Sequence, residues 1–502
     1  MLSTFRSLAA FSIFPLLFGQ ACGNDQGPDL ASAEASGDDS AGDPNENPDA
    51  SPDPDTSSGN PDGPPVDPPP PPAEGSRRLV PEFEEHNAVI VGSGAVLSFG
   101  VEEIAEAVLA AGAQVLVTMP AEYDPQDEAS LRAVVRSEVE VWLEPAEFVL
   151  GEFTPDEQYR WFLSSYAEML DGERSDLVEQ AEQVFAQGDG EAALAYVLEV
   201  NEALVELTYE RFAGLAEDSR VTLLPTQLDF EDEPSIWVRD DGPLLTEDAR
   251  GRRGVPYQEG KFNAAAQLTK TEFVRVAEEQ GRGPFELRPM NRIAVGGAIM
   301  TNGDGTCVLG GALALEIDEP AYLDELSCAT IIEEQSMPYE ATGHVDMWAK
   351  FVDETTIMIS EVDDESMQRV IEGGNEEHIS QHEEIIAFFE SQADLYDDMG
   401  FDVIRIPMPA VAYLDSAPTV LSYANATFVN TAGKQTVLLP HYTREYWETV
   451  VGDVYDANRL EELEAEAAAA FRQVGYEVIP VKTNIGPSLQ GSVHCMTMQT
   501  RW

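Results

Sequence analysis

A repeated helix-to-strand pattern runs through residues 78–502 and constrains the fold more than any other feature of the chain. In each copy a helix-forming stretch ends at a glycine or a polar residue, and a short β-branched run then ends at a proline; copies lie at 111–120, 218–225, 400–407 and 475–480. Glycine suits the left-handed end of a helix, and β-branched residues suit a buried strand. The alternation predicts an α/β fold, in which repeated units around an axis are one available arrangement.

Residues 155–217 interrupt this alternation, because they predict helix almost throughout, with a break near 187–190. The segment is therefore interpreted as two or three helices inserted between strands. Such an insertion could cover one side of a binding site, but a peripheral helical decoration is the simpler interpretation.

The first 21 residues predict an export signal. Arg6 supplies a positive charge, and the apolar run at 8–18 is too short to span a bilayer comfortably. Cys22 follows in a sequence that resembles a bacterial lipoprotein cleavage site, although Gly19 stands where a leucine is usual. We therefore expect a protein exported from a bacterial cell and anchored to a membrane through lipidated Cys22, with a secreted or periplasmic form as the alternative.

Residues 22–77 consist largely of Asp, Pro, Ser, Gly and Asn and offer almost nothing to bury. They predict a disordered, partly polyproline tether that leads into a folded body at 78–502.

The chain is strongly acidic, with 93 acidic and 28 basic residues and a formal net charge of −65. Such a surface repels phosphate backbones, which argues against nucleic acid as a partner. It would attract cations such as arginine-like or polyamine substrates. A solvated surface suited to a salty medium explains the charge equally simply, and we favour that interpretation.

Four polar clusters follow apolar, strand-like runs, which is where α/β enzymes place reactive groups. They lie at 236–243, 342–348, 422–425 and 491–497. Each alone has an ordinary explanation, such as an ion pair, a strand-end hydrogen bond or an inert buried thiol. Their order and spacing are more informative than any single cluster.

Together with 81–84 and the paired glycines Gly296 and Gly297, these clusters resemble the agmatine deiminase and bacterial peptidylarginine deiminase family, within the guanidino-group-modifying superfamily. The resemblance covers most of residues 80–502 apart from the helical insertion. It implies a five-bladed, pseudo-symmetric α/β propeller of ββαβ-type units. It also implies a hydrolase that removes ammonia from a guanidinium group and that needs neither a cofactor nor a metal.

The resemblance implies specific roles. A guanidinium is a planar cation that carboxylates can grip bidentately, and a thiolate can then add to its central carbon. Asp240 and Asp346 would hold the substrate, Cys495 would be the nucleophile, and His344 would protonate departing ammonia and then activate water. The remaining expected substrate contacts are Asn425, Trp237 and Arg239. His494 is predicted to be a structural partner, because adjacent side chains on a strand point to opposite faces.

Two departures from the family pattern bear on the substrate. Val295 and Ala298 flank the paired glycines, where the family often has an acidic and a small polar residue. The approach to Cys495 at 487–491 is also altered. Neither change touches the four proposed catalytic positions.

Cys307 and Cys328 remain once Cys22 and Cys495 have been assigned. In an oxidising compartment they could form a disulfide, and two buried free thiols are the alternative.

The leading hypothesis is hydrolytic deimination of agmatine or of peptidyl-arginine. Export favours an arginine-containing peptide, whereas overall similarity leans toward the agmatine branch. A non-catalytic cell-surface protein that binds cationic guanidino or polyamine ligands is the alternative. The sequence alone predicts no oligomeric state.

Overall fold

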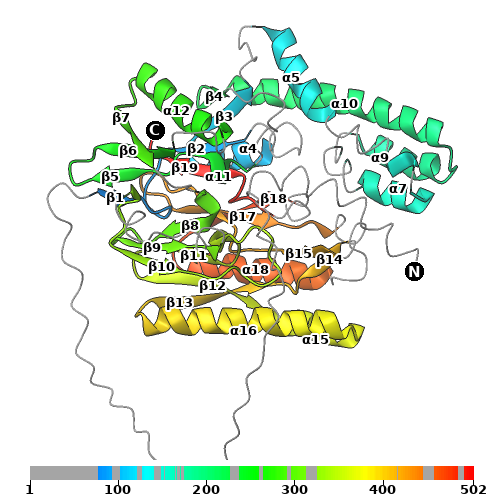
Figure 1. The fold of residues 1–502 in the computed structure, drawn as a ribbon. Helices are drawn as coiled ribbons and strands as arrows, with labels where there is room; N and C mark the ends of the chain where they lie inside the picture. The colour runs from blue at the N-terminus through cyan, green and yellow to red at the C-terminus, as the bar shows by residue number, and fades with distance from the viewer. Residues whose placement is uncertain are drawn as a thin grey trace, which may run out of the picture. The chain divides into compact units, whose positions relative to one another are not determined.

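The structure is a computed structural model (Figure 1). It describes residues 77–92, 102–120, 127–140, 149–226 except 152, 164–165, 167–169 and 171–173, then 237–258, 264–290, 295–311, 325–414, 417–444, 457–483 and 491–502. Residues 74–502 form one compact unit. The predicted export signal, Cys22 and the predicted tether lie outside the described residues.

Strands of the compact unit form several small mixed sheets, which confirms the predicted α/β class. The first sheet has the order β19 (Thr497–Thr500), β2 (Ala88–Val91), β3 (Gln114–Pro120) and β4 (Val221–Thr226). The second has β1 (Arg77–Leu79), β5 (Thr246–Asp248), β6 (Arg253–Gln258) and β7 (Phe285–Met290).

Three further sheets have three described strands each. They comprise β8 (Ile299–Thr301), β9 (Thr306–Leu309) and β10 (Thr330–Glu333); β11 (Ala349–Phe351), β12 (Thr356–Val362) and β13 (Asp402–Met408); and β16 (Thr427–Phe428), β17 (Thr436–His441) and β18 (Glu477–Lys482). A separate hairpin pairs β14 (Ala412–Leu414) with β15 (Ala417–Thr419).

These five sheets share one connectivity. In each, an antiparallel pair is followed by a parallel pair, as in β11–β12 and β12–β13. The same order occurs in β19–β2–β3, β5–β6–β7, β8–β9–β10 and β16–β17–β18. A parallel pair needs a crossover, and helices lie in four of these connections: α4 (Glu102–Ala111), α12 (Ala264–Glu279), α15 (Asp364–Gly373) with α16 (Glu376–Asp398), and α18 (Ala457–Gln473).

The predicted helix-to-strand repeats are present as expected. The four β runs at 111–120, 218–225, 400–407 and 475–480 correspond to β3, β4, β13 and β18. Gly112, Gly400 and Gly475 have φ of 96°, 89° and 97°, which is the left-handed region that glycine enters without steric cost. The glycine therefore ends the helix and turns the chain into the buried strand.

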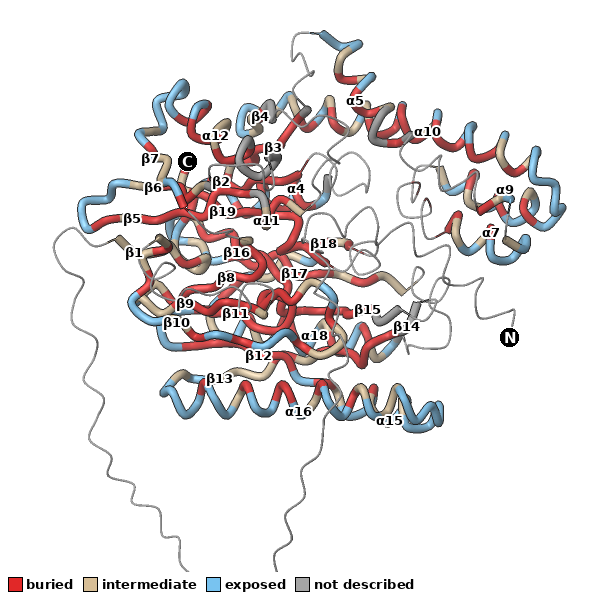
Figure 2. Tube along the Cα trace, viewed as in Figure 1, coloured by how far each residue is buried: buried red, intermediate tan, exposed pale blue. Residues whose placement is uncertain are grey.

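The helices bury one face against the sheets. In α16 the side chains of Ile385, Phe389 and Tyr396 are buried, and the helix packs on β12, while much of its other face is exposed (Figure 2). Each such large apolar side chain stabilises the fold by roughly 1.5–3 kcal/mol relative to exposure.

The segment between β3 and β4 contains the helices α5 (Glu128–Glu140), α7 (Pro155–Phe162), α9 (Ser175–Phe185) and α10 (Gly190–Ala216). The break near 187–190 is present, and Asp189 caps α10 by accepting hydrogen bonds from the amides of Glu191 and Ala192. In the described part of the segment, α10 packs on α4, α5, α9 and β4 (Figure 1).

Within the described residues, no helix is long and apolar enough to cross a membrane.

Candidate active site

Cys495 lies in a turn immediately before β19, not on the strand that its surroundings predicted. Its side chain is buried, with 6% of the residue exposed. The amide group of Asn425 holds it on two sides: Nδ2 donates to Cys495 Sγ at 3.1 Å, and Oδ1 accepts from the Cys495 backbone N–H at 3.3 Å. The pairing of β19 with β2 and the bonds from Asn425 thus fix the position of the sulfur.

Asp346 lies on the other side of the sulfur. Its Oδ2 atom is 3.7 Å from Cys495 Sγ and 2.6 Å from His494 Nδ1. Asp346 belongs to a single 3₁₀ turn, η3 (Val345–Met347), and His344 is the residue before that turn. A turn, not the end of a strand, therefore brings the two side chains to the site.

Asp240 lies on the short helix α11 (Val238–Asp241), where the sequence suggested a strand end. Its Oδ1 atom accepts a hydrogen bond from the Gly297 N–H at 3.2 Å and is 3.9 Å from His344 Nδ1. Gly297 must be glycine here, because an added Cβ would lie within 3.0 Å of the His344 ring. The paired glycines thus allow His344 to approach Asp240.

Glu340 anchors the loop that leads to His344. Its two carboxylate oxygens accept hydrogen bonds from the amides of Thr342, Gly343 and His344, at 2.9, 2.7 and 3.3 Å. Burial raises the pKa of the Glu340 carboxyl, and the neighbouring imidazole of His344 opposes that shift. In its ionised form Glu340 adds negative charge beside His344 as well as fixing the loop.

The buried carboxylates of the site change the pKa values of both His344 and Cys495. Burial opposes the charged form of His344, but Asp240, Asp346 and Glu340 outweigh it and raise the pKa of the imidazole above its ordinary value. Burial, together with the charges of Asp346 and Asp240, raises the pKa of the Cys495 thiol well above its ordinary value. The arrangement therefore favours the protonated form of His344 and the neutral form of the Cys495 thiol beside two carboxylates.

Two buried polar atoms of this cluster, Asp346 Oδ1 and His344 Nε2, have no hydrogen-bond partner among the described residues. A buried polar group left unpaired is costly, and a catalytic role is one of the explanations for such groups in a native structure. Asp346 Oδ1 can accept a hydrogen bond from a planar ligand that carries N–H groups. The His344 imidazole and the Cys495 sulfur are available to react with such a ligand.

The sequence profile of the Porphyromonas-type peptidyl-arginine deiminases matches residues 164–500, which is about two thirds of the chain. The chain belongs to this family. The predicted relationship to the agmatine and peptidylarginine deiminase hydrolases is thereby confirmed.

Solved structures agree on the fold. An agmatine deiminase from C. jejuni superposes with a TM-score of 0.50 at 14% identity, covering 85% of this chain and 96% of that one. A cysteine-to-serine variant of the C. jejuni enzyme with substrate bound gives 0.50 at 13% identity, with the same coverage. No curated protein sequence matches the chain.

Arg239, expected to contact substrate, lies instead among protein groups of the deiminase fold. Its Nη1 donates to Glu82 at 2.8 Å, its Nε donates to the His494 carbonyl at 3.3 Å, and its Nη2 donates to Gln499. Its backbone N–H donates to the Cys495 carbonyl at 3.0 Å, so Arg239 connects α11 to the cysteine turn.

Trp237, also expected to contact substrate, is half-buried at the start of α11. Its ring packs on Gly491, where an added Cβ would collide with it. The indole of Trp237 fits here only because Gly491 has no side chain.

Sequence reasoning missed Glu82 and Lys350 as members of the site. Glu82 lies in the 81–84 motif that carried part of the resemblance. Lys350 is the polar residue of an alternating apolar–polar run that directly follows the cluster at 342–348, as in a strand. Both signals were visible, but only the tertiary structure shows that Lys350 Nζ donates to Glu82 Oε2 at 3.0 Å. Within the described residues, no cluster of side chains could hold a metal ion.

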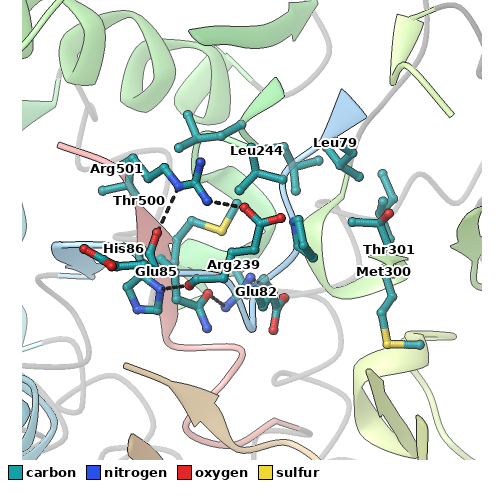
Figure 3. A pocket seen from close by; sticks show the side chains of 17 residues that line it. Leu79, Glu82, Glu85, His86, Arg239, Leu244, Met300, Thr301, Thr500 and Arg501 are labelled. Carbon is teal, nitrogen blue, oxygen red and sulfur yellow. Dashed lines mark hydrogen bonds and ion pairs between the residues drawn. The ribbon is translucent and has the colours of Figure 1, made fainter. Parts of the chain in front are cut away.

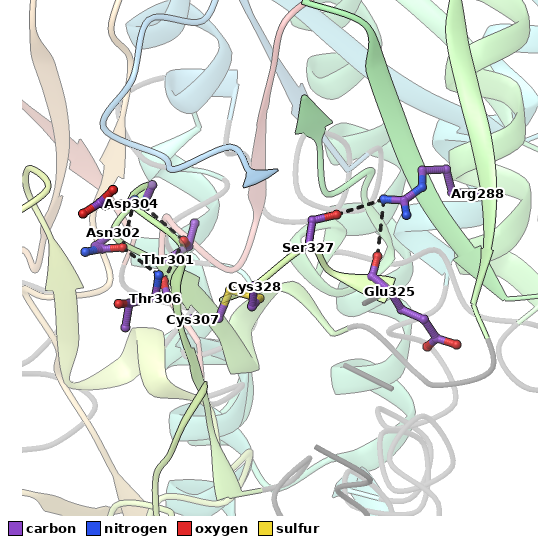
Figure 4. Close-up of a disulfide and its surroundings, with 10 residues drawn as sticks. Arg288, Thr301, Asn302, Asp304, Thr306, Cys307, Glu325, Ser327 and Cys328 are labelled. Carbon is purple, nitrogen blue, oxygen red and sulfur yellow. Dashed lines mark hydrogen bonds between the residues drawn. A yellow bond between two sulfur atoms is a disulfide. The ribbon is translucent and has the colours of Figure 1, made fainter. Parts of the chain in front are cut away.

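Cys307 and Cys328 form a disulfide with a Cα–Cα distance of 5.8 Å (Figure 4). Of the two alternatives open from the sequence, the structure thus contains the bonded one. The bond ties β9 to the residues just before β10, which is its parallel neighbour. The disulfide is not part of the site around Cys495 and His344. It links two segments of the sheet that precedes the His344 loop.

Proposed function

We propose that this protein hydrolyses the guanidinium group of agmatine or of peptidyl-arginine to a ureide and releases ammonia through a covalent intermediate on Cys495. The observation that carries the proposal is the convergence of the Asp240 and Asp346 carboxylates on one cysteine and on one histidine whose pKa they raise. A guanidinium is the cation that two such carboxylates bind best, because its N–H groups match their geometry.

The first half-reaction begins when the bound cation offsets the two carboxylates that raise the thiol pKa. The proton of Cys495 then passes to solvent water, the thiolate adds to the guanidinium carbon, and His344 donates a proton to the departing nitrogen. The C–N bond breaks, ammonia leaves, and a thiouronium remains on the sulfur.

In the second half-reaction His344, now neutral, takes a proton from water. The resulting hydroxide adds to the thiouronium carbon, the C–S bond breaks, and the electron pair returns to the sulfur. The hydroxyl proton of the product then passes to this thiolate, which restores the Cys495 thiol and leaves a neutral ureide, while the proton released in the first half-reaction leaves with ammonia as ammonium. One water is consumed and one ammonia is released for each ureide formed.

Asn425 fits a role at the sulfur better than a direct substrate contact. Its amide hydrogen bond to Sγ would favour the thiolate and orient it during attack. We therefore propose Asn425, with Asp240, Asp346, His344 and Cys495, as the groups that touch the reacting atoms.

Ureide formation from agmatine and from an arginyl peptide tests the proposal, with Cys495→Ala as the inactive control. Product from one substrate identifies the substrate class. If the folded wild type, with Cys495 as a free thiol, forms no ureide from either substrate, the proposal is wrong and a non-catalytic protein that binds guanidino or polyamine cations is favoured.

We also propose that the five sheets of shared connectivity are the blades of a pseudo-symmetric propeller. The antiparallel pairing of the C-terminal strand β19 with the N-terminal strand β2 supports this arrangement, because it would close a ring of blades.

Export with lipidation at Cys22 remains our proposal for localisation. The Cys307–Cys328 disulfide supports it, since such bonds persist in oxidising compartments.

A further inference from the structure

One carboxylate behind the active site contacts three buried, nitrogen-bearing side chains. Glu82 Oε1 accepts a hydrogen bond from Arg239 at 2.8 Å, and Oε2 accepts from Lys350 at 3.0 Å and contacts His494 Nε2 at 2.6 Å. The three partner side chains are at most 4% exposed. Glu82 and Arg239 also line a pocket, and His86 and Arg501 are among its other lining residues (Figure 3).

The imidazole of His494 bridges this carboxylate to the reacting groups. Its Nε2 lies 2.6 Å from Glu82 Oε2 and its Nδ1 lies 2.6 Å from Asp346 Oδ2. An ionised carboxylate can only accept a hydrogen bond, so a ring held between two of them carries a hydrogen on both nitrogens.

Both carboxylates are held in the ionised form. Burial alone would raise the pKa of Glu82, but Arg239, His494 and Lys350 lower it well below its ordinary value. Burial also opposes ionisation of Asp346, and the hydrogen bond and charge of His494 lead the interactions that lower its pKa.

We propose that Glu82 is a positioning residue for deimination: it holds His494 as an imidazolium, and this cation fixes the Asp346 carboxylate beside Cys495. The inference rests on the proposed function. With Oδ2 held by His494, the free Oδ1 atom of Asp346 stays available for the substrate guanidinium. Without the bridge, Asp346 could rotate and lose that orientation.

A purely structural role makes a different prediction. If Glu82 only neutralised Arg239 and Lys350, His494 would need no second proton, and the state of its ring would not respond to Glu82. Among the described residues, the charged groups beside His494 are Glu82 and Asp346 at its nitrogens, Arg239 at its carbonyl, and Lys350, which lines a pocket with it.

The protonation state of His494 in the wild type tests the proposal without any substitution. Nitrogen NMR of histidine-labelled protein, with His494→Gln to assign the signal, should show both His494 nitrogens protonated from about pH 6 to about pH 8. A neutral His494 ring in this range would overturn the proposal, whether or not the protein proves to be a deiminase.

Glu82→Gln keeps the size of the side chain and removes its charge. We expect the His494 signal to change to that of a neutral ring and kcat/KM to fall about 10²-fold, with the acid limb of its pH profile moved to higher pH because Asp346 has lost its cation. Glu84→Gln is the matched control: Glu84 pairs with Arg78 and Arg501 and has no bond to His494, so the His494 signal and kcat/KM should stay at wild-type values.

Glu82→Gln leaves two buried cations without their counter-charge, and it could therefore fail to fold. The double variant Glu82→Gln/Lys350→Met removes one of them and should fold while its His494 ring remains neutral and its kcat/KM low. A double variant with an imidazolium at His494 and wild-type kcat/KM would overturn the proposal. If the wild type itself forms no ureide, the proposed function fails, and the NMR signals still decide the role of Glu82.

Discussion

The side-chain amide of Asn425 donates a hydrogen bond to the sulfur of Cys495 at 3.1 Å, while its oxygen accepts from the backbone N–H of the same residue. Both atoms of one amide are thus used to hold the nucleophile. Because this donor is buried, it should stabilise a developing thiolate more than it would in water.

Replacing that donor tests its role directly. In Asn425→Asp a carboxylate oxygen would face the sulfur and oppose the thiolate, so we expect kcat to fall by about 10²–10³-fold. Steady-state ureide formation measures the change, with thermal unfolding to verify the fold. A variant that keeps wild-type kcat would show that the amide is not needed at the sulfur.

The two carboxylates should make the free thiol less reactive even though turnover requires them. Since Asp240 raises the pKa of Cys495, Asp240→Asn should lower that pKa and increase the rate at which iodoacetamide alkylates Cys495 near neutral pH, while ureide formation is lost. In the wild type the fraction of Cys495 in the thiolate form should rise only at pH values above the ordinary pKa of a cysteine thiol.

Mass analysis of the Cys495 peptide over time measures this alkylation, and Cys495→Ser gives the background. Slower alkylation in Asp240→Asn than in the wild type would contradict the electrostatic argument.

Gly297 should be intolerant of any side chain. An added Cβ would meet the His344 ring, so Gly297→Ala should displace the imidazole from Asp240 and lower kcat/KM by about 10²-fold. Gly373→Ala is the matched control, because nothing lies within 4 Å of its added Cβ at the end of α15. Kinetic constants and thermal unfolding of both variants measure the effect, and equal activity in the two would count against this placement of His344.

The disulfide should contribute to stability and not to chemistry. The bond spans 21 positions, and removing it in Cys307→Ser/Cys328→Ser should lower the free energy of unfolding by about 3 kcal/mol, mainly by freeing the unfolded chain. Urea unfolding measures this loss. Activity of the folded double variant should stay within about twofold of wild type, since neither sulfur touches the reacting groups.

Local sequence determined the secondary structure of the repeats and indicated the four residues proposed as catalytic, but not Glu82 or Lys350. A glycine with positive φ before a β-branched run is a local preference, and β3, β13 and β18 follow it because neighbouring residues decide backbone conformation there. The motifs around Asp240, His344, Asn425 and Cys495 also identify the family before any contact is known.

Local sequence was misleading at the polar clusters themselves. They form a short helix at 238–241, a 3₁₀ turn at 345–347 and a turn before β19, where strand ends were expected. Long-range hydrogen bonds decide these conformations, such as the one from the Arg239 N–H to the Cys495 carbonyl.

Only the tertiary structure could bring Glu82 to His494, because the two are separated by 412 positions. Their contact depends on how strands from both ends of the chain meet in the folded unit, with β19 paired to β2. The residue types proposed to react can therefore be read from the sequence. The protonation and orientation of those residues follow from charges that folding alone brings within hydrogen-bonding distance.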